Sequence, residues 1–170
     1  MNSRKVLPIL LAMSLLIALS GCGKKIKNCI GNISYSSTAV CMCYEEVPGE
    51  YSDDGSAVKG IVYREVTDLD GIMKQKEMPV LIYFYTTANP TAAGITAGVE
   101  DLAERLNGKV VVVALDSNAY PTVNTELGVM AVPEFVLMNG GSKVAAFGSN
   151  SKTSWTIADV SSWLKDNGIG

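Results

Sequence analysis

The stretch from Val80 to Tyr85 constrains the fold of this chain more than any other segment. It is a continuous run of β-branched, apolar and aromatic residues, preceded by Pro79 and followed by a polar turn. Such a run is typical of a strand that is buried on both faces of a sheet. After the turn come Asn89, which favours a helix N-cap, and Pro90, which favours the first helical position. The sequence therefore predicts a buried strand that leads into a helix, at the end of a sheet where functional sites of open α/β folds gather.

Strand and helix patterns alternate through the second half of the chain. The residues at 95, 99, 102 and 106 are apolar and form one stripe along the helix expected after Asn89. The segment 139–141 (Asn-Gly-Gly) predicts a hairpin turn. These patterns indicate an α/β domain with a mixed sheet flanked by helices. The expected strands are 61–65, 80–85, 109–116, 134–138 and 143–147, and the expected helices are a short one near 67–73, then 89–106, 121–127 and 151–167.

The order and spacing of these segments resemble the thioredoxin family. The run 79–85 followed by a turn and a helix, and the strand 110–116, look like the core of that fold. The segment 128–135 (Gly-Val-Met-Ala-Val-Pro-Glu-Phe) is similar to the family's Gly-Val-x-x-Ile-Pro-Thr loop. The resemblance covers roughly residues 58–170 and implies a thioredoxin-like fold with a cis Val132–Pro133 bond.

The residues that would perform thiol chemistry in that family are replaced in this chain. Tyr83 aligns with the family's buried Asp, and Ala114 aligns with the Lys of the neighbouring strand. No catalytic residue is therefore assigned to the start of the helix. The vestigial segment, which aligns with the family's Cys-x-x-Cys, consists of Asn89, Pro90, Thr91 and Ala92.

The loop around Val132 and Pro133 is the remaining candidate site. In the thioredoxin family this loop faces the Cys-x-x-Cys helix and presents its backbone to an extended peptide, which the resemblance extends to this chain. The alternative is that Pro133 only shapes the turn into the following hairpin. The first interpretation predicts a binding site for a protein or peptide partner at Val132 and Pro133.

The first 21 residues are typical of a signal peptide rather than of a folded segment. Arg4 and Lys5 form a basic start, and an apolar stretch too short for a comfortable membrane span follows. The sequence 19–22 (Leu-Ser-Gly-Cys) then resembles the bacterial lipobox, which predicts lipidation of Cys22 and attachment to the membrane outside the cytoplasm. The alternative is a plain signal peptide that ends near Ala18.

Residues 22–57 are expected to be a flexible tether, with the folded domain at 58–170. This tether contains Cys29, Cys41 and Cys43, which allow the pairs 29–41, 29–43 and 41–43. One interpretation is a disulfide that closes a loop, and a second is redox exchange by the Cys41-Met42-Cys43 sequence. A third is binding of a soft metal by these thiolates and Met42, and a fourth is thiols without a role.

Composition excludes several classes of function. The chain has no histidine, which removes Ser-His catalysis and histidine metal sites. Its net charge is −3, and removal of the basic signal peptide makes it more acidic, so nucleic acid is not an expected partner. We expect no metal and no cofactor. The sequence thus predicts a membrane-anchored, non-catalytic module that binds an envelope protein or peptide, with a thiol-disulfide oxidoreductase using Cys29, Cys41 and Cys43 as the alternative.

Overall fold

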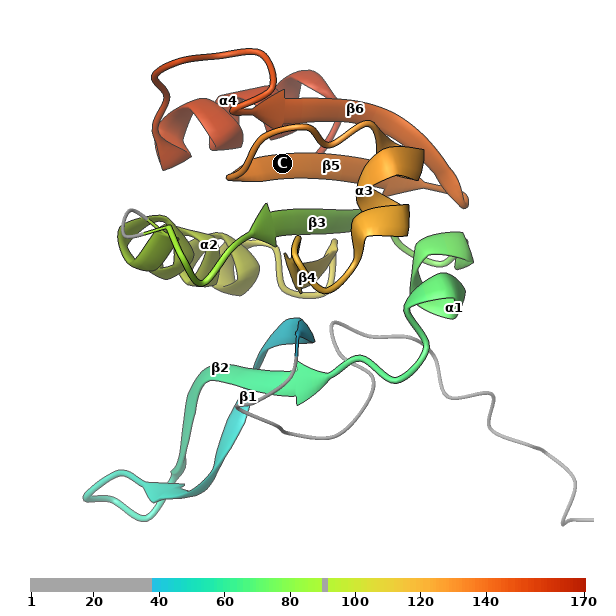
Figure 1. Ribbon diagram of the computed structural model, residues 1–170. Coiled ribbons are helices and arrows are strands. Elements are labelled where there is room, and N and C mark those ends of the chain that lie inside the picture. Colours follow the sequence, from blue (N-terminus) through green and yellow to red (C-terminus); the bar gives the residue numbers. More distant parts are fainter. Residues whose placement is uncertain (1–37, 90–91) are drawn as a thin grey trace, which may run out of the picture.

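The computed structural model describes residues 38–89 and 92–170, which form a six-stranded sheet flanked by helices (Figure 1). The segment predicted to be a signal peptide, together with Cys22 and Cys29, lies outside the described residues. Within those residues, none of the helices has the length and apolar character needed to cross a membrane. The strands are β1 (Ala39–Tyr51), β2 (Ala57–Glu65), β3 (Val80–Tyr85), β4 (Val111–Asp116), β5 (Glu134–Asn139) and β6 (Ser142–Gly148). The helices are α1 (Leu69–Lys74), α2 (Ala92–Arg105), α3 (Pro121–Leu127) and α4 (Ile157–Asp166).

The sheet is mixed, as predicted, with the strand order β2-β1-β4-β3-β5-β6. Strands β3 and β4 run parallel at its centre, and α2 connects them. Strand β5 runs antiparallel to β3 and forms a hairpin with β6. The predicted strands and helices therefore occur in the predicted order, and β3 has the predicted bounds.

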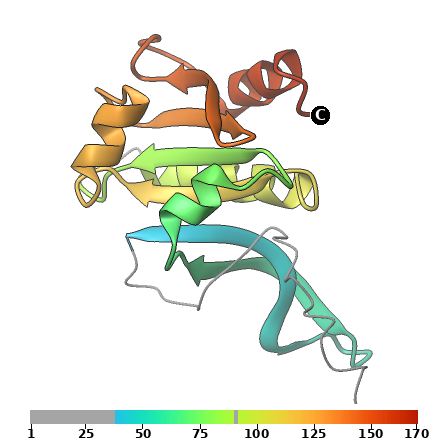
Figure 2. The same ribbon diagram turned by 90° about the vertical axis from the view of Figure 1, so that its right-hand side faces the viewer.

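Two hydrophobic layers cover the two faces of the sheet (Figures 1 and 2). Leu81 and Tyr83 point to the layer that contains α2 and α4, whereas Ile82 and Phe84 point to the layer that contains α1 and α3. Because both faces of the sheet are covered, the side chains on both faces of β3 must be apolar. This explains why the apolar run in β3 is unbroken. The predicted stripe of α2 faces the first layer, where Val99 is completely buried.

The predicted tether is wrong over Ala39–Tyr51, which is the longest strand of the sheet. Strand β1 pairs with β2 on one side, where Cys43 lies opposite Val62, and with β4 on the other, where Cys41 lies opposite Val113. A domain boundary at residue 58 would fall inside β2 and would remove β1. The far part of the β1–β2 hairpin extends away from the rest of the domain (Figures 1 and 2).

The last helix also begins later than predicted, at Ile157 rather than at residue 151. Thr156 is its N-cap and forms a capping box with Asp159, because each residue's side chain bonds to the other's backbone N–H. Trp155 therefore precedes the helix, and its ring packs edge-on against Phe135, with 5.6 Å between the ring centroids. The N-cap role of Asn89 stays a prediction, because residues 90–91, which join Asn89 to the described start of α2, lie outside the described part of the chain.

Candidate functional site

The two predicted site segments leave the sheet at the same end. Strand β3 pairs with β5 as far as Phe84 and Glu134, so the chain after β3 and the chain before β5 continue side by side from that pair. After β3 the backbone turns, and the N–H of Asn89 donates to the carbonyl oxygen of Thr86 at 3.2 Å. Pro90 and Thr91 lie outside the described residues, and helix α2 is described from Ala92 onward.

The segment 128–133, called the proline loop here, connects α3 to β5. Helix α3 ends at Gly128, whose φ of 68° is the left-handed conformation that glycine adopts without strain. The Val132–Pro133 bond is cis, as predicted. Pro133 is buried, and its carbonyl oxygen already accepts a hydrogen bond from the N–H of Ser149 at 3.0 Å. The side chain of Pro133 is therefore not available to a partner, whereas Val132 is half-buried.

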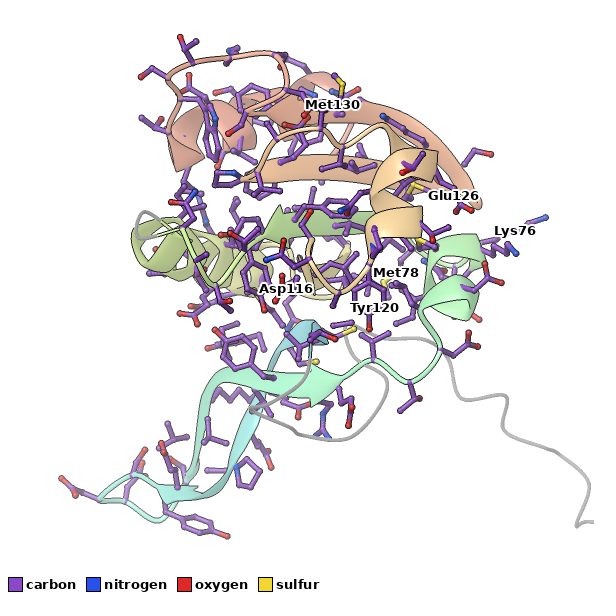
Figure 3. All side chains as sticks on the ribbon, viewed as in Figure 1. Lys76, Met78, Asp116, Tyr120, Glu126 and Met130 are labelled. Atoms are coloured by element: carbon purple, nitrogen blue, oxygen red, sulfur yellow. The ribbon has the colours of Figure 1, made fainter. Side chains whose placement is uncertain are left out.

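Met130 is the most exposed large apolar residue described for this domain. It is 86% exposed and lies in the proline loop (Figure 3). The backbone of this loop is nevertheless fixed to the rest of the domain. Oδ1 of Asn150 accepts hydrogen bonds from the N–H of Met130 at 3.0 Å and from the N–H of Ala131 at 2.8 Å. Nδ2 of Asn150 donates to the carbonyl oxygen of Gly128 at 2.7 Å.

A buried carboxylate lies directly behind this contact. Glu134 is 1% exposed, and its Oε2 accepts a hydrogen bond from the N–H of Asn150 at 2.9 Å. Burial raises the pKa of the Glu134 carboxyl, while the hydrogen bond from Asn150 and the nearby charge of Lys143 act to lower it. Sequence reasoning missed both Glu134 and Asn150, because the two residues are far apart in the chain and no local pattern links them.

Tyr83 and Ala114 occupy the region where the family resemblance would place proton-handling groups. They lie opposite each other in the pairing of β3 with β4, so a large ring stands beside a small side chain. Tyr83 is completely buried, and its hydroxyl lies 3.3 Å from Oγ1 of Thr96. Burial raises the pKa of the Tyr83 phenol, so the group stays protonated at neutral pH.

Stacked aromatic rings surround Tyr83 on the sheet. Its ring centroid lies 5.6 Å from that of Tyr85 and 5.2 Å from that of Phe135. Burial also raises the pKa of the Tyr85 phenol, and the nearby carboxylate of Asp116 adds to this effect. This side of the candidate site therefore presents packed aromatic rings, and the pKa of both phenols is raised.

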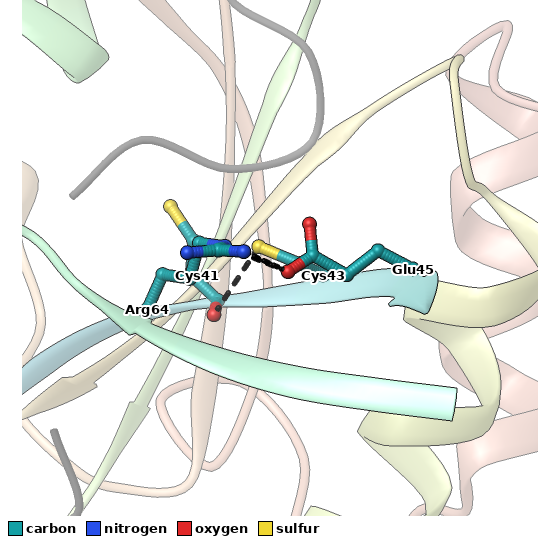
Figure 4. Close-up of polar contacts among 4 residues, drawn as sticks. All are labelled: Cys41, Cys43, Glu45 and Arg64. Carbon is teal, nitrogen blue, oxygen red and sulfur yellow. Dashed lines mark hydrogen bonds and ion pairs between the residues drawn. The ribbon is translucent and has the colours of Figure 1, made fainter. Parts of the chain in front are cut away.

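The cysteines at 41 and 43 lie in the core rather than in a tether. Both are 0% exposed and face the layer of α1 and α3, whereas Met42 faces the opposite layer. Met42 therefore cannot join the two sulfurs in one metal site. Close by, Glu45 of β1 and Arg64 of β2 form an ion pair, and Nε of Arg64 donates at 2.8 Å (Figure 4).

Cys43 is disulfide-bonded. A bridge from Cys43 to Cys41 is excluded by strand geometry. Side chains two residues apart on one face of a strand point the same way, so their Cβ atoms are about 6.6 Å apart, whereas the Cβ atoms of a disulfide are about 3.8 Å apart. The sulfur of Cys43 instead lies 3.7 Å from the carbonyl oxygen of Cys41 (Figure 4). The pairs that involve Cys29 stay predictions, because Cys29 lies outside the described residues.

Comparison with solved structures identifies the fold that this arrangement defines. The oxidised mitochondrial thioredoxin 3 of Saccharomyces cerevisiae superposes with a TM-score of 0.50 and 22% sequence identity, over 59% of this chain and 88% of that chain. At this identity the likeness concerns the fold alone, which is thioredoxin-like.

Sequence comparison names the family. The thioredoxin family model matches residues 61–161, more than half of the chain, and the chain therefore belongs to the thioredoxin family. Thioredoxin Y, a chloroplastic protein of Oryza sativa subsp. japonica, is 23% identical over 99 residues, which are 58% of this chain and 59% of that protein. Thioredoxin 1 of Nostoc sp. is 27% identical over 79 residues, 44% of this chain and 74% of that protein. This chain thus spans about three fifths of the rice relative, and β1 precedes the family match.

Proposed function

We propose that this chain is a non-catalytic member of the thioredoxin family that binds an extended protein or peptide segment at the proline loop. The exposed side chain of Met130 supports this proposal most directly. The Met130 side chain is 86% exposed, and it stands on a loop whose backbone is held by Asn150, so it is available to a partner in a fixed position. A fixed loop loses little conformational entropy on binding, so it is suited to present Met130 and Val132 to a partner.

The sequence and the packing both support the proposal that this site performs no thiol chemistry. No cysteine occurs after Cys43, and the resemblance aligns Asn89 and Ala92 with the family's two cysteines. Burial keeps the phenol of Tyr83 protonated, so it cannot accept a proton from a thiol at neutral pH. The proposed site therefore recognises a partner without changing it.

The alternative, disulfide exchange at Cys41 and Cys43, meets a barrier of access. An attacking thiolate must reach the sulfur that it attacks, and both side chains are 0% exposed in the folded domain. We therefore favour a structural role for the Cys43 disulfide, which restricts the unfolded chain.

We further propose that the domain is anchored outside the cytoplasm by lipid on Cys22. The motif at 19–22 behind a short apolar stretch supports this proposal. Expression of Cys22→Ala in a bacterial host should move the protein from the membrane fraction to the soluble fraction, because one residue carries the attachment. Retention of the variant in membranes after a salt wash would contradict lipid anchoring.

Peptide binding can be tested with an array of unstructured peptides that contain no cysteine. The protein should bind a subset of these peptides, and Met130→Asp should abolish that binding. Val144→Asp is the matched control, since Val144 is an exposed apolar residue, 50% exposed, on β6. Thermal unfolding should show that both variants remain folded. Peptide binding that survives Met130→Asp, or no binding by the parent protein, would refute the proposal.

An insulin-reduction assay with dithiothreitol separates the proposal from its alternative. The parent domain should give no rate above the background of dithiothreitol alone. A rate above background that disappears in a Cys41→Ser/Cys43→Ser variant would instead support thiol-disulfide exchange by these two residues.

A further inference from the structure

We propose that Asn150 is a positioning residue that sets the shape of the proline loop for its partner, and that the buried carboxylate of Glu134 holds Asn150 in place. This inference rests on the proposed function, since it assigns the residues that would prepare the same site for binding.

The side chain of Asn150 makes three hydrogen bonds to the backbone of the proline loop. Oδ1 of Asn150 accepts from two successive backbone N–H groups, those of Met130 and Ala131, at 3.0 and 2.8 Å. Nδ2 of Asn150 donates to the carbonyl oxygen of Gly128 at 2.7 Å. Successive N–H groups that point to one oxygen fix the direction of the backbone, so the side chain of Met130 is turned away from Asn150 and toward solvent.

The position of Asn150 is itself determined by Glu134. Oε2 of Glu134 accepts from the N–H of Asn150 at 2.9 Å, and Glu134 directly follows the proline loop in the chain. The Glu134–Asn150 pair therefore ties the end of the loop to its beginning.

The backbone at Gly148 leaves room for this pair. Gly148 has a φ of 141°, and a Cβ atom at this position would lie 2.6 Å from the carbonyl oxygen of Pro133 and 2.8 Å from Oε2 of Glu134. Both distances are shorter than any ordinary contact, so a side chain here would displace the carboxylate that holds Asn150. Pro133, Glu134, Gly148 and Asn150 thus form one packed unit behind the loop.

This arrangement also indicates how a partner is recognised. The N–H groups of Met130 and Ala131 are used inside the domain, so a docked segment does not pair with them. Recognition instead falls on the side chains of Met130 and Val132, which favours an extended segment that presents an apolar residue.

The test compares Asn150→Ala with Asn150→Asp and with the control Asn118→Ala, whose side chain is exposed. Amide hydrogen exchange is measured by NMR for individual residues, and affinity is measured for a cysteine-free peptide selected on the array. Asn150→Ala should speed exchange at Met130 and Ala131 by about 10-fold relative to the core strands, because each amide loses its acceptor. It should weaken peptide binding by a similar factor.

Asn150→Asp should preserve slow exchange at both amides, because a carboxylate oxygen can replace Oδ1, and Asn118→Ala should change neither quantity. Equal acceleration of exchange throughout the domain, or unchanged peptide affinity in Asn150→Ala, would overturn the positioning role. The exchange measurement needs no ligand. If Asn150→Ala speeds exchange at the two amides but the parent protein binds no peptide, the proposed function and the binding role of Asn150 both fail, while the anchoring of the loop is confirmed.

Discussion

Replacement of Gly98 by Ala should destabilise the domain, although the substitution normally favours a helix. Gly98 lies in α2, where an Ala would be expected to stabilise by about 1 kcal/mol. At this position, however, an added Cβ would lie 2.4 Å from Cγ1 and 3.1 Å from Cδ1 of Ile157, the first residue of α4. Ordinary contacts between carbon atoms are about 3.5–4.0 Å, so the two helices must move apart or Ile157 must leave its rotamer.

Overpacking of this kind costs about 1–3 kcal/mol, which exceeds the gain in helix propensity for most of that range. We therefore expect Gly98→Ala to lower the free energy of unfolding by about 1 kcal/mol in urea denaturation. Gly94→Ala in the same helix is the matched control, because a Cβ there would meet nothing within 4 Å. That variant should be neutral or slightly more stable.

A double-mutant cycle identifies the contact. In an Ile157→Ala background the clash with Cγ1 and Cδ1 is gone, so Gly98→Ala should become neutral or stabilising. Equal stabilisation by Gly98→Ala and Gly94→Ala in the parent protein would refute the close approach of α2 and α4 at this point.

Three further perturbations test the packing around the site and the last helix. Gly148→Ala should lower the free energy of unfolding, measured in urea, by about 2 kcal/mol or more. The added Cβ would meet the Pro133 carbonyl oxygen and the Glu134 carboxylate, and the φ of 141° at this position disfavours any side chain. The raised pKa of Glu134 means that the folded state binds the proton of this carboxyl more tightly than the unfolded state does. Protonated Glu134 therefore contributes to stability at low pH, and this contribution is lost as the pH rises above the ordinary value of 4.5 and through the folded pKa. Glu134→Gln should remove that pH dependence, and an identical pH profile for the variant would contradict the shift. Thr156→Ala should lower the free energy of unfolding by about 1 kcal/mol through loss of the capping box with Asp159, measured against the exposed control Ser162→Ala.

The elements that sequence reasoning predicted well are those whose signals are local. Strand β3 is a continuous apolar run, and helix α3 begins with Pro121 and ends before Gly128, so each carries its own boundaries. The order of strands and helices then restricts the topology to few choices. The sequence pattern predicts too early a start for α4, because the segment 151–156 is polar like the helix surface, although Thr156 and Asp159 form the capping signal.

Strand β1 was missed because its composition hides the strand pattern. Cys41 and Cys43 alternate with Met42 and fill core positions as small apolar side chains. The Pro48-Gly49 pair and the segment 52–56 suggested a linker, but they form an irregularity in the β1–β2 pairing and the hairpin turn. The residues that suggest a tether therefore belong to a hairpin.

The Glu134–Asn150 pair could not have been predicted from sequence patterns. Its hydrogen bonds connect residues 16–22 positions apart, across a loop, a strand hairpin and a turn. Periodicity and capping rules describe neighbours within a few residues, and they carry no information on such contacts. The candidate binding residue Val132 was found through resemblance, whereas the residues that shape its loop required the tertiary structure.

The place of β1 in the sheet has a consequence for the order in which the chain can fold. Strand β1 comes first in the chain among the described strands, yet it lies between β2 and β4, and Ala39 pairs with Leu115. The β1–β2 hairpin can form early, but its other edge stays open until β4 pairs with it, and open strand edges favour association with other chains. Cys43 is 0% exposed in the complete domain, where it faces the layer of α1 and α3. Its disulfide therefore forms most readily before these helices cover β1, and the timing of oxidation relative to folding should influence the yield of the native protein.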